Sequence, residues 1–319
     1  MKVIVTGGAG FIGSNIVAAL NARGIEDVLV VDRLDDPLKE KNLAALRIAD
    51  YLDKTDFRMQ FLAGRIDRPD VVFHLGACSS TTETDAAYLD DNNVLYTQQL
   101  CTWCLAGDVR FIYASSAATY GDGAQGYSDD PARIPSLKPL NLYGASKQAF
   151  DRWVLDNGLL DRVVGLKYFN VYGPREHHKG PMRSLVNKAY RQILDTGEMM
   201  LFQSYRPEYA DGEQERDFIY VRDAVDVTLF FEEHRGIGGI YNCGTGTART
   251  WLDLAHALFG AMQREPRIRF VEMPEDIRPN YQYHTQADTA RLRAAGYAAP
   301  FTPLEEGVRD YVRSDLETS

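Results

Sequence analysis

Cysteine is scarce in this sequence of 319 residues, which contains Cys78, Cys101, Cys104 and Cys243. Cys101 and Cys104 have the spacing of a redox or zinc pair, but they lie in an apolar helical stretch, Leu95–Leu105, without a second pair of ligands. We therefore expect reduced, structural thiols and no metal site.

Long apolar runs and an excess of positive charge are also missing. No apolar run approaches the roughly 20 residues that cross a bilayer. The first apolar stretch, Val3–Val5, leaves no room for a charged leader and a cleavage site, so we expect a cytoplasmic protein. The formal net charge of −10 argues against a general affinity for nucleic acid or acidic membranes, and we expect neither as a partner.

Strand and helix patterns alternate through the first half of the chain. Apolar strands are expected at 2–6, 27–32, 70–74, 110–114 and 162–168, with helices at 11–22, 85–105 and 143–155. Such alternation produces a parallel sheet with helices on both faces. The predicted fold class is α/β, a doubly wound parallel sheet (Rossmann) with a second, smaller mixed α/β domain.

The second half is less regular. A helix is expected at 182–194, a polar loop at 203–215, strands at 217–221, 239–242 and 268–271, a helix at 223–234 and two or three more helices after residue 250. We predict a dinucleotide-binding domain over 1–170 that also recovers about 217–242. The substrate-binding domain would comprise 171–216 and 243–319.

A glycine-rich segment, Thr6–Gly13, joins the first strand to the first helix. Gly8, Gly10 and Gly13 satisfy the dinucleotide pattern G-x-G-x-x-G, in which they allow a tight turn, a close approach to the pyrophosphate and close helix packing. The helix N-terminus adds partial positive charge toward the phosphates. The motif alone is weak, but the flanking strand and helix, and an acid ending the next strand, favour a dinucleotide site.

That acid is Asp32, which would bond the adenosine ribose and by itself favours NAD. Arg33, Lys39 and Lys54 would instead neutralise the 2′-phosphate of NADP. Because Lys and Arg are usually solvated surface charges, their spacing favours NADP over NAD only modestly.

Tyr143-Gly-Ala-Ser-Lys147 places Lys147 one helical turn after Tyr143, on the same face. A free tyrosine has a pKa of about 10, and we expect the lysine and an oxidised nicotinamide to lower the pKa of Tyr143. Ser116, at a strand end, would hold the substrate hydroxyl while Tyr143 takes its proton. A pair on an ordinary surface helix is the alternative for this common motif.

These segments together resemble the extended short-chain dehydrogenase/reductase superfamily, whose members act on nucleotide sugars. The resemblance rests on Thr6–Gly13, Ser115–Gly121, Tyr143–Lys147, Tyr168–Arg175 and Arg216–Val221. Other segments are similar to one family in it, the ADP-L-glycero-D-manno-heptose 6-epimerases: Gly76–Glu83, Asp91–Asn93, Glu176–Gly180, Thr285–Asp288 and Arg293–Tyr297.

This resemblance implies an isomerase of carbohydrate metabolism that supplies lipopolysaccharide core precursors. It would invert C6″ of ADP-D-glycero-D-manno-heptose through a transient 6″-ketone, with tightly bound NADP, as a homo-oligomer (a pentamer). Tyr143 and Lys179 would be the two acid/base groups. The cofactor would contact Gly7, Gly10, Phe11, Ile12, Gly13, Asp32, Arg33, Lys39, Lys54, Leu75, Gly76, Ala77, Cys78, Ser79, Asn92 and Lys147. The substrate would contact Ser116, Asn170, Pro181, Lys188, Phe202, Arg216 and Tyr281.

A second proton donor suits this chemistry, because the hydride must leave one face of C6″ and return to the other. Rotation about C5″–C6″ would turn the ketone and move its oxygen away from Tyr143 toward Lys179. The alternative for Lys179 is a contact with phosphate or cofactor only. Some members of the family have asparagine in place of Arg33 and histidine in place of Lys188, which makes the role of Lys188 less certain.

The remaining charged residues have weaker interpretations. His177 and His178 are adjacent on a loop, so they point apart, and no carboxylate accompanies them; we expect no metal there. Arginines that could hold the diphosphate are Arg175, Arg183, Arg206 and, as the strongest candidate, Arg216.

Three other functions are compatible with parts of the pattern. A UDP-hexose 4-epimerase would share everything up to Lys147 and differ at Lys179. A 4,6-dehydratase needs an acid–base pair where Ala117 and Ala118 stand, which argues against it. An NADP-binding redox sensor commonly lacks the catalytic tyrosine or lysine, and both are present here.

Overall fold

A computed structural model describes residues 1–275, 277–278 and 281–318. Its main feature is a seven-stranded sheet in the order β3-β2-β1-β4-β5-β6-β10, in which all neighbouring strands are parallel. The strands are β1 (Val3–Thr6), β2 (Val28–Asp32), β3 (Asp50–Asp53), β4 (Val71–His74), β5 (Arg110–Ser116), β6 (Val163–Tyr168) and β10 (Gly239–Cys243).

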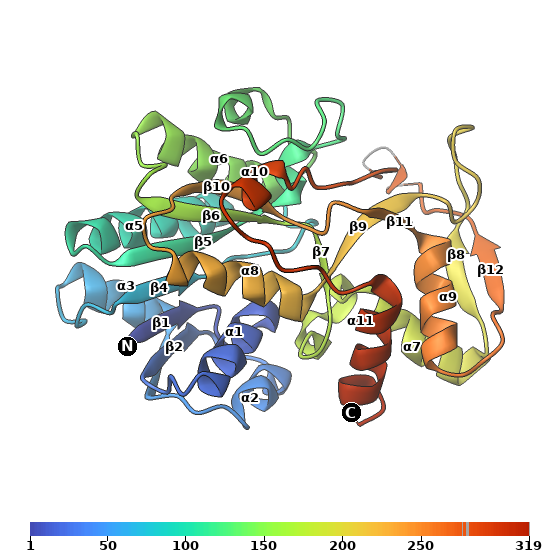
Figure 1. Ribbon diagram of the computed structural model, residues 1–319, viewed down its shortest axis with the longest axis horizontal. Helices are drawn as coiled ribbons and strands as arrows, with labels where there is room; N and C mark the ends of the chain where they lie inside the picture. The colour runs from blue at the N-terminus through green and yellow to red at the C-terminus, as the bar shows by residue number, and fades with distance from the viewer. Residues whose placement is uncertain (276, 279–280, 319) are drawn as a thin grey trace.

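Helices cover both faces of this sheet (Figure 1). Alternate residues of a strand point to opposite faces, so Val3 and Val5 of β1 join one apolar core and Ile4 joins the other. The first core includes α1 (Phe11–Ala22) and α8 (Val221–Glu233). The second includes α3 (Lys54–Leu62), α5 (Tyr96–Ala106) and α6 (Leu142–Asp156). The predicted doubly wound α/β fold is confirmed.

The smaller lobe lies at one end of the large sheet (Figure 1). Its three-stranded sheet has the order β11-β9-β7, and β8 pairs with β12 in parallel. The strands are β7 (Asn170–Tyr172), β8 (Met199–Phe202), β9 (Glu215–Tyr220), β11 (Ala248–Thr250) and β12 (Ile268–Val271). Its helices are α7 (Leu185–Thr196), α9 (Trp251–Ala261) and α11 (Leu304–Tyr311), whereas α10 (Ala290–Ala294) packs against β10 of the large sheet.

Short elements complete the chain: α2 (Pro37–Leu43), α4 (Ala86–Leu89) and the turns η1 (Asp90–Leu95), η2 (Ala117–Tyr120), η3 (Pro131–Ser136), η4 (His177–Met182) and η6 (Val312–Leu316). The single helix expected over 85–105 is α4, a π-helical turn η1 and α5 in succession. The helix expected from residue 182 begins at Leu185, because Gly180 adopts a positive φ of 54° and Met182 ends the preceding turn.

The strand expected at 217–221 differs from the prediction in its partners. It is β9, which pairs with β7 and β11 in the smaller sheet, whereas β10 takes the place beside β6 at the edge of the large sheet. The edge strand β3 was not predicted, because two of its four residues are Asp and none is fully buried. The division into domains at residues 170, 216 and 242 stays a prediction.

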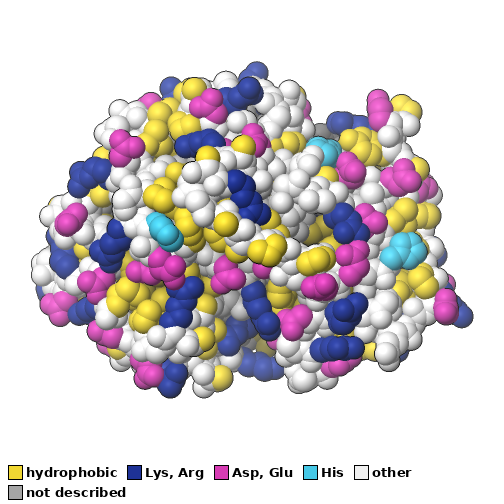
Figure 2. Space-filling view, in the orientation of Figure 1, with side chains coloured by type: hydrophobic (Ala, Val, Ile, Leu, Met, Phe, Trp, Pro, Cys, Tyr) yellow, Lys and Arg dark blue, Asp and Glu magenta, His cyan; other side chains and the backbone are white. Residues whose placement is uncertain are grey.

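Acidic and basic side chains are interspersed on the face in Figure 2. Cys101, Cys104 and Cys243 are buried free thiols, and burial raises the pKa of Cys101 to about 12. Within the described ranges, no helix is both long and apolar enough to span a membrane.

Candidate active site

A cavity of about 950 Å³ opens at the carboxyl ends of the parallel strands and is lined by residues of both lobes. The loops after β1 and β4 meet there, where the strand order reverses, which is where open α/β sheets bind ligands. The predicted residues that line it are Gly7, Gly10, Phe11, Ile12, Gly13, Asp32, Arg33, Lys39, Leu75, Gly76, Ala77, Cys78, Ser79, Ser116, Tyr143, Lys147, Asn170, Lys179, Lys188, Phe202 and Tyr281.

Four predicted residues lie outside this lining. Lys54 and Asn92 are joined by a hydrogen bond of 2.7 Å from Lys54 Nζ to Asn92 Oδ1. Pro181 carries the carbonyl that accepts from Lys188 Nζ at 3.3 Å. Arg216 lies beneath the aromatic side chains described below.

The glycine-rich loop is packed too tightly for side chains. Gly7 has a φ of +67°, and a Cβ there would lie 2.7 Å from Gly76 N. A Cβ on Gly13 would lie 2.1 Å from Gly7 O. The α1 N-terminus follows, with Gly10 as its N-cap and no capping side chain, so its amides face the cavity. This cradle fits a dinucleotide pyrophosphate.

Asp32 and the nearby cations occupy the end of β2. Asp32 Oδ2 accepts from Ala9 N at 2.9 Å, and Oδ1 accepts from Lys39 Nζ at 2.9 Å. The Arg33 guanidinium is 58% exposed and pairs with Asp35 Oδ2 at 2.7 Å. Burial and, secondarily, Arg33 lower the pKa of Lys54. The Asp32 carboxylate therefore fixes the glycine-rich loop. Arg33 remains at the surface near Lys39 and Lys54.

Tyr143 and Lys147 lie on α6 as the motif predicts, and the lowering of the Tyr143 pKa by Lys147 and an oxidised nicotinamide stays a prediction. Burial raises the pKa of Tyr143, and its hydrogen bond with Ser116 opposes this only partly. Lys147 Nζ donates to Ala114 O at 2.8 Å. Burial lowers the pKa of Lys147 to about 8, opposed by Asp151.

Asp151, one turn beyond Lys147 on α6, was missed by sequence reasoning. Its Oδ2 lies 2.5 Å from Lys167 Nζ, and neither side chain is more than 1% exposed. Tyr113 OH and Ser115 Oγ also donate to this carboxylate, at 2.9 and 2.7 Å. The buried pair therefore joins α6 to the ends of β5 and β6, which carry the residues around Ser116. Its only signal in the sequence was the i+4 spacing from Lys147.

The opposite wall of the cavity is the segment after β7. Arg175 has a φ of 74°, a strained conformation for a residue other than glycine, and its Nη1 donates to Ser14 O at 3.0 Å. The buried Glu176 carboxylate accepts from Ser184 N at 2.6 Å and from Tyr311 OH at 3.0 Å. These bonds attach the segment to α1, α7 and α11.

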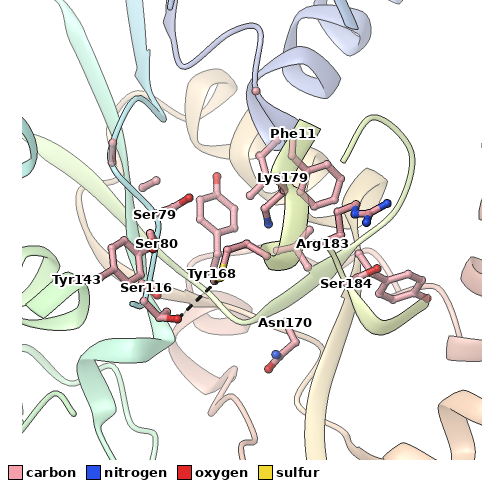
Figure 3. Close-up of a pocket in the computed structure, with 18 of the residues that line it drawn as sticks. Phe11, Ser79, Ser80, Ser116, Tyr143, Tyr168, Asn170, Lys179, Arg183 and Ser184 are labelled. Atoms are coloured by element: carbon pink, nitrogen blue, oxygen red, sulfur yellow. Dashed lines mark hydrogen bonds between the residues drawn. The ribbon is translucent and has the colours of Figure 1, made fainter. Parts of the chain in front are cut away.

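Lys179 extends from this segment toward the cavity, with its Nζ 5.2 Å from the centre of the Phe11 ring (Figure 3). Burial lowers the pKa of Lys179, with Lys188 adding to the effect and Glu176 opposing it. In the part of the chain that the structure describes, no hydrogen bond or ion pair engages the Lys179 amine. The predicted acid/base residues Tyr143 and Lys179 therefore line one cavity, Tyr143 from α6 and Lys179 from the segment after β7.

Aromatic side chains close the far end of the cavity. The buried Arg216 guanidinium lies 5.2 Å from the Tyr281 ring centre and 5.5 Å from that of Trp251. Trp251 Nε1 donates to Tyr281 OH at 2.9 Å, and burial lowers the pKa of Arg216. Sequence reasoning missed Trp251, which no motif marked.

Other lining residues were predicted only in part. Ser80 and Thr81 belong to the segment that carried the family resemblance but were not proposed as contacts.

Of the other diphosphate candidates, Arg183 lines the cavity, whereas Arg175 donates its hydrogen bonds to backbone carbonyls. The exposed Arg206 packs on Tyr283, with 4.6 Å between its guanidinium and the ring centre. Across the described positions, no group of three or more His, Cys, Asp or Glu could hold a metal ion.

Comparison with known proteins identifies the family of this chain. Residues 3–244 match the NAD dependent epimerase/dehydratase family. An ADP-L-glycero-D-manno-heptose-6-epimerase of Nitratidesulfovibrio vulgaris (strain DP4) is 54% identical over 316 residues, which are 98% of this chain and 97% of the relative. The chain belongs to the NAD dependent epimerase/dehydratase family. The resemblance inferred from sequence motifs is thereby confirmed.

Solved structures of this epimerase family share the fold. The ADP-L-glycero-D-manno-heptose-6-epimerase of Helicobacter pylori has a TM-score of 0.81 and 27% identity, over 98% of this chain and 95% of that one. The UDP-glucose 4-epimerase of Thermus thermophilus, in complex with NAD, has a TM-score of 0.78 and 29% identity, over 98% of each chain. The fold supports a nicotinamide dinucleotide as cofactor but is common to 6- and 4-epimerases.

Proposed function

We propose that this protein is an ADP-L-glycero-D-manno-heptose 6-epimerase, an isomerase that inverts C6″ of ADP-D-glycero-D-manno-heptose for lipopolysaccharide core precursor synthesis. The observation that carries the proposal is the placement of two acid/base candidates in one cavity, Tyr143 beside Ser116 and Lys179 beside Phe11 (Figure 3). The 54% identity to a relative of that name supports the same substrate.

The cofactor we propose is tightly bound NADP. Arg33, Lys39 and Lys54 lie around the end of β2, where the adenosine ribose would bind beside Asp32. A guanidinium and two ammonium groups would balance a 2′-phosphate. Asp32 remains the feature that favours NAD, but Lys39 already neutralises part of its charge at 2.9 Å.

Arg33→Ala tests this cofactor preference. Because Arg33 is largely exposed, its removal leaves the fold intact, and we expect the Kd for NADP to rise roughly tenfold or more with little change for NAD. Isothermal titration of the nucleotide-free chain with each dinucleotide measures this difference. Equal losses for NADP and NAD would show that Arg33 does not contact the 2′-phosphate.

In the proposed mechanism, the glycine-rich loop and Asp32 would hold the dinucleotide, whose nicotinamide would supply the hydride acceptor and donor for C6″. Ser116 holds the C6″ hydroxyl by a hydrogen bond, and Tyr143 accepts its proton, with the Lys147 ammonium nearby. The C6″ carbonyl lies outside the sugar ring, so rotation about C5″–C6″ presents its other face without release of ADP. Lys179 would then donate a proton to the carbonyl oxygen when C6″ is reduced, which matches the proton that Tyr143 accepted during oxidation.

The remaining contacts are proposed from family resemblance. Asn170, Lys188, Phe202 and Tyr281 line the cavity and would surround the heptose and its diphosphate. Arg216 and Pro181 would act from just behind this lining. We also propose a homo-oligomer, a pentamer by resemblance.

Proton NMR of ADP-D-glycero-D-manno-heptose incubated with the protein tests the function directly. We expect the C6″ proton signals of the L-glycero epimer to appear without added cofactor, since the hydride returns to the substrate. A UDP-hexose 4-epimerase would instead change the C4″ signals of UDP-glucose. A redox sensor would change neither substrate, and that outcome would refute the proposed function.

A further inference from the structure

The adjacent residues His177 and His178 have different surroundings. His177 Nε2 lies 2.6 Å from Asp315 Oδ2 in η6, and its Nδ1 lies 3.3 Å from Asn187 Nδ2 in α7. His178 turns the other way and lines the cavity, with its Nδ1 3.3 Å from Asn42 Nδ2 in α2. One ring therefore supports the fold, and the other faces the site.

His178 lies over the glycine-rich loop. A Cβ built on Gly10 would lie 4.0 Å from His178 Nε2, so this nitrogen is close to the point where the backbone approaches the dinucleotide pyrophosphate. Asn42 Nδ2 also donates to Ala9 O at 3.0 Å and to Arg175 O at 3.1 Å. Asn42 therefore joins the loop to the segment that carries the histidine.

The neighbours of His178 favour one of its two tautomers. Because an amide nitrogen is only a donor, a proton on Nδ1 would face the Asn42 amide at 3.3 Å, and the tautomer with the proton on Nε2 avoids this conflict. Burial lowers the pKa of His178 to about 4; Lys39 and Lys179 add to this effect, and Asp32 and Asp36 oppose it. At neutral pH the ring is therefore uncharged and presents an N–H to the cavity.

We propose that His178 is a cofactor-binding residue whose Nε2–H donates a hydrogen bond to the pyrophosphate of the bound dinucleotide. The α1 N-terminus supplies donors from the large lobe, and His178 supplies one from the segment after β7. Because Lys179 is the next residue, this bond also fixes the position of the acid/base lysine relative to the cofactor. The inference rests on the proposed function only in requiring a dinucleotide in this site.

Binding of three ligands to the full-length, nucleotide-free chain tests this role. NADP and 2′-phospho-ADP-ribose contain the pyrophosphate, whereas 2′-AMP lacks it. We expect His178→Ala to weaken the first two roughly tenfold or more and to leave the Kd for 2′-AMP unchanged, which also verifies that the variant folds. His178→Gln, which retains a donor, should recover much of the affinity.

The adjacent residue provides a matched control. His177→Ala removes the contact with Asp315 but should bind all three ligands as the wild type does. An unchanged NADP affinity in His178→Ala, or a proton on Nδ1 in nitrogen-15 NMR of His178, would overturn the inference. A wild-type chain that binds none of the three ligands would instead refute the proposed function.

Discussion

At the scale of single residues, burial shifts the pKa values of the two acid/base candidates, Tyr143 and Lys179, in opposite directions. The pKa of Tyr143 rises because the phenolate is desolvated, and the pKa of Lys179 falls because the ammonium is desolvated. Desolvation therefore favours the neutral form of both groups. As a neutral phenol Tyr143 can only donate a proton, and as a neutral amine Lys179 can only accept one, so proton transfer in the opposite sense requires the phenolate and the ammonium.

Tyr143→Phe should abolish turnover and leave the cofactor bound. Loss of the hydroxyl removes the proton acceptor, which typically costs about 10²–10⁴ in rate, while the ring still fills its place beside Ser116. Proton NMR measures turnover, and the absorbance of nucleotide released on denaturation measures the cofactor. Full activity in this variant would remove the proposed mechanism.

Lys179→Met should lose most of the epimerisation but retain one-way oxidation or reduction of an aldehyde analogue. Methionine is similar in length and keeps the contact with Phe11, but it has no proton to exchange. Comparing epimerisation with the one-way reaction separates proton transfer from binding. An unaffected epimerisation rate would return Lys179 to a binding role.

At the scale of elements, the segment from Gly173 to Met182 forms one wall of the site and is held in place by contacts with three helices. Arg175 bonds the backbone of α1, and Glu176 bonds the N-terminus of α7 and a tyrosine of α11. The positive φ of Arg175 is a strain that these contacts offset. The segment is therefore fixed before any ligand binds, so Lys179 has a defined place.

Glu176→Gln should shift the pH dependence of the reaction. The Glu176 carboxylate raises the pKa of Lys179, so its neutralisation lowers that pKa further, and the part of the pH–rate profile set by Lys179 moves to lower pH. Glu176→Asp keeps the charge and serves as the control. Identical profiles for the glutamine variant and the wild type would exclude Glu176 as a determinant of Lys179 ionisation.

At the scale of the whole molecule, the cavity lies between two lobes that exchange chain segments. The chain leaves the large sheet after β6, builds β7 to β9 and returns through α8 to β10. It then forms β11, α9, β12 and α11 of the smaller lobe, with α10 packed against β10 on the way. A ligand in the cavity touches residues of both lobes. Its binding should therefore stabilise the entire molecule.

NADP should raise the Tm of the nucleotide-free chain. A ligand at one hundred times its Kd stabilises the folded state by about 2.7 kcal/mol, which corresponds to roughly 5 °C for a chain of this size. Differential scanning calorimetry measures the shift, with AMP at the same concentration as the control. An equal shift with AMP would indicate that only the adenosine half of the site is formed.

The sequence by itself determined the parallel sheet, the glycine-rich loop and the positions of Tyr143 and Lys147 on one helix. Each depends on local rules, namely the apolar periodicity of strands and helices, the absence of a side chain at Gly7 and Gly13, and the four-residue helical spacing. Family motifs added Lys179, which no local rule distinguishes from an ordinary loop lysine.

Only the tertiary structure decided which strands β9 joins, how Asp151 meets Lys167 and which ring nitrogen of His178 faces the cavity. It also showed that burial raises the pKa of Tyr143. The physical reason is the same in each case: pairing, burial and hydrogen bonding depend on partners far away in the chain. Asp151 and Lys167 are 16 residues apart, and Asn42 and His178 are 136 residues apart, so no local pattern specifies either contact.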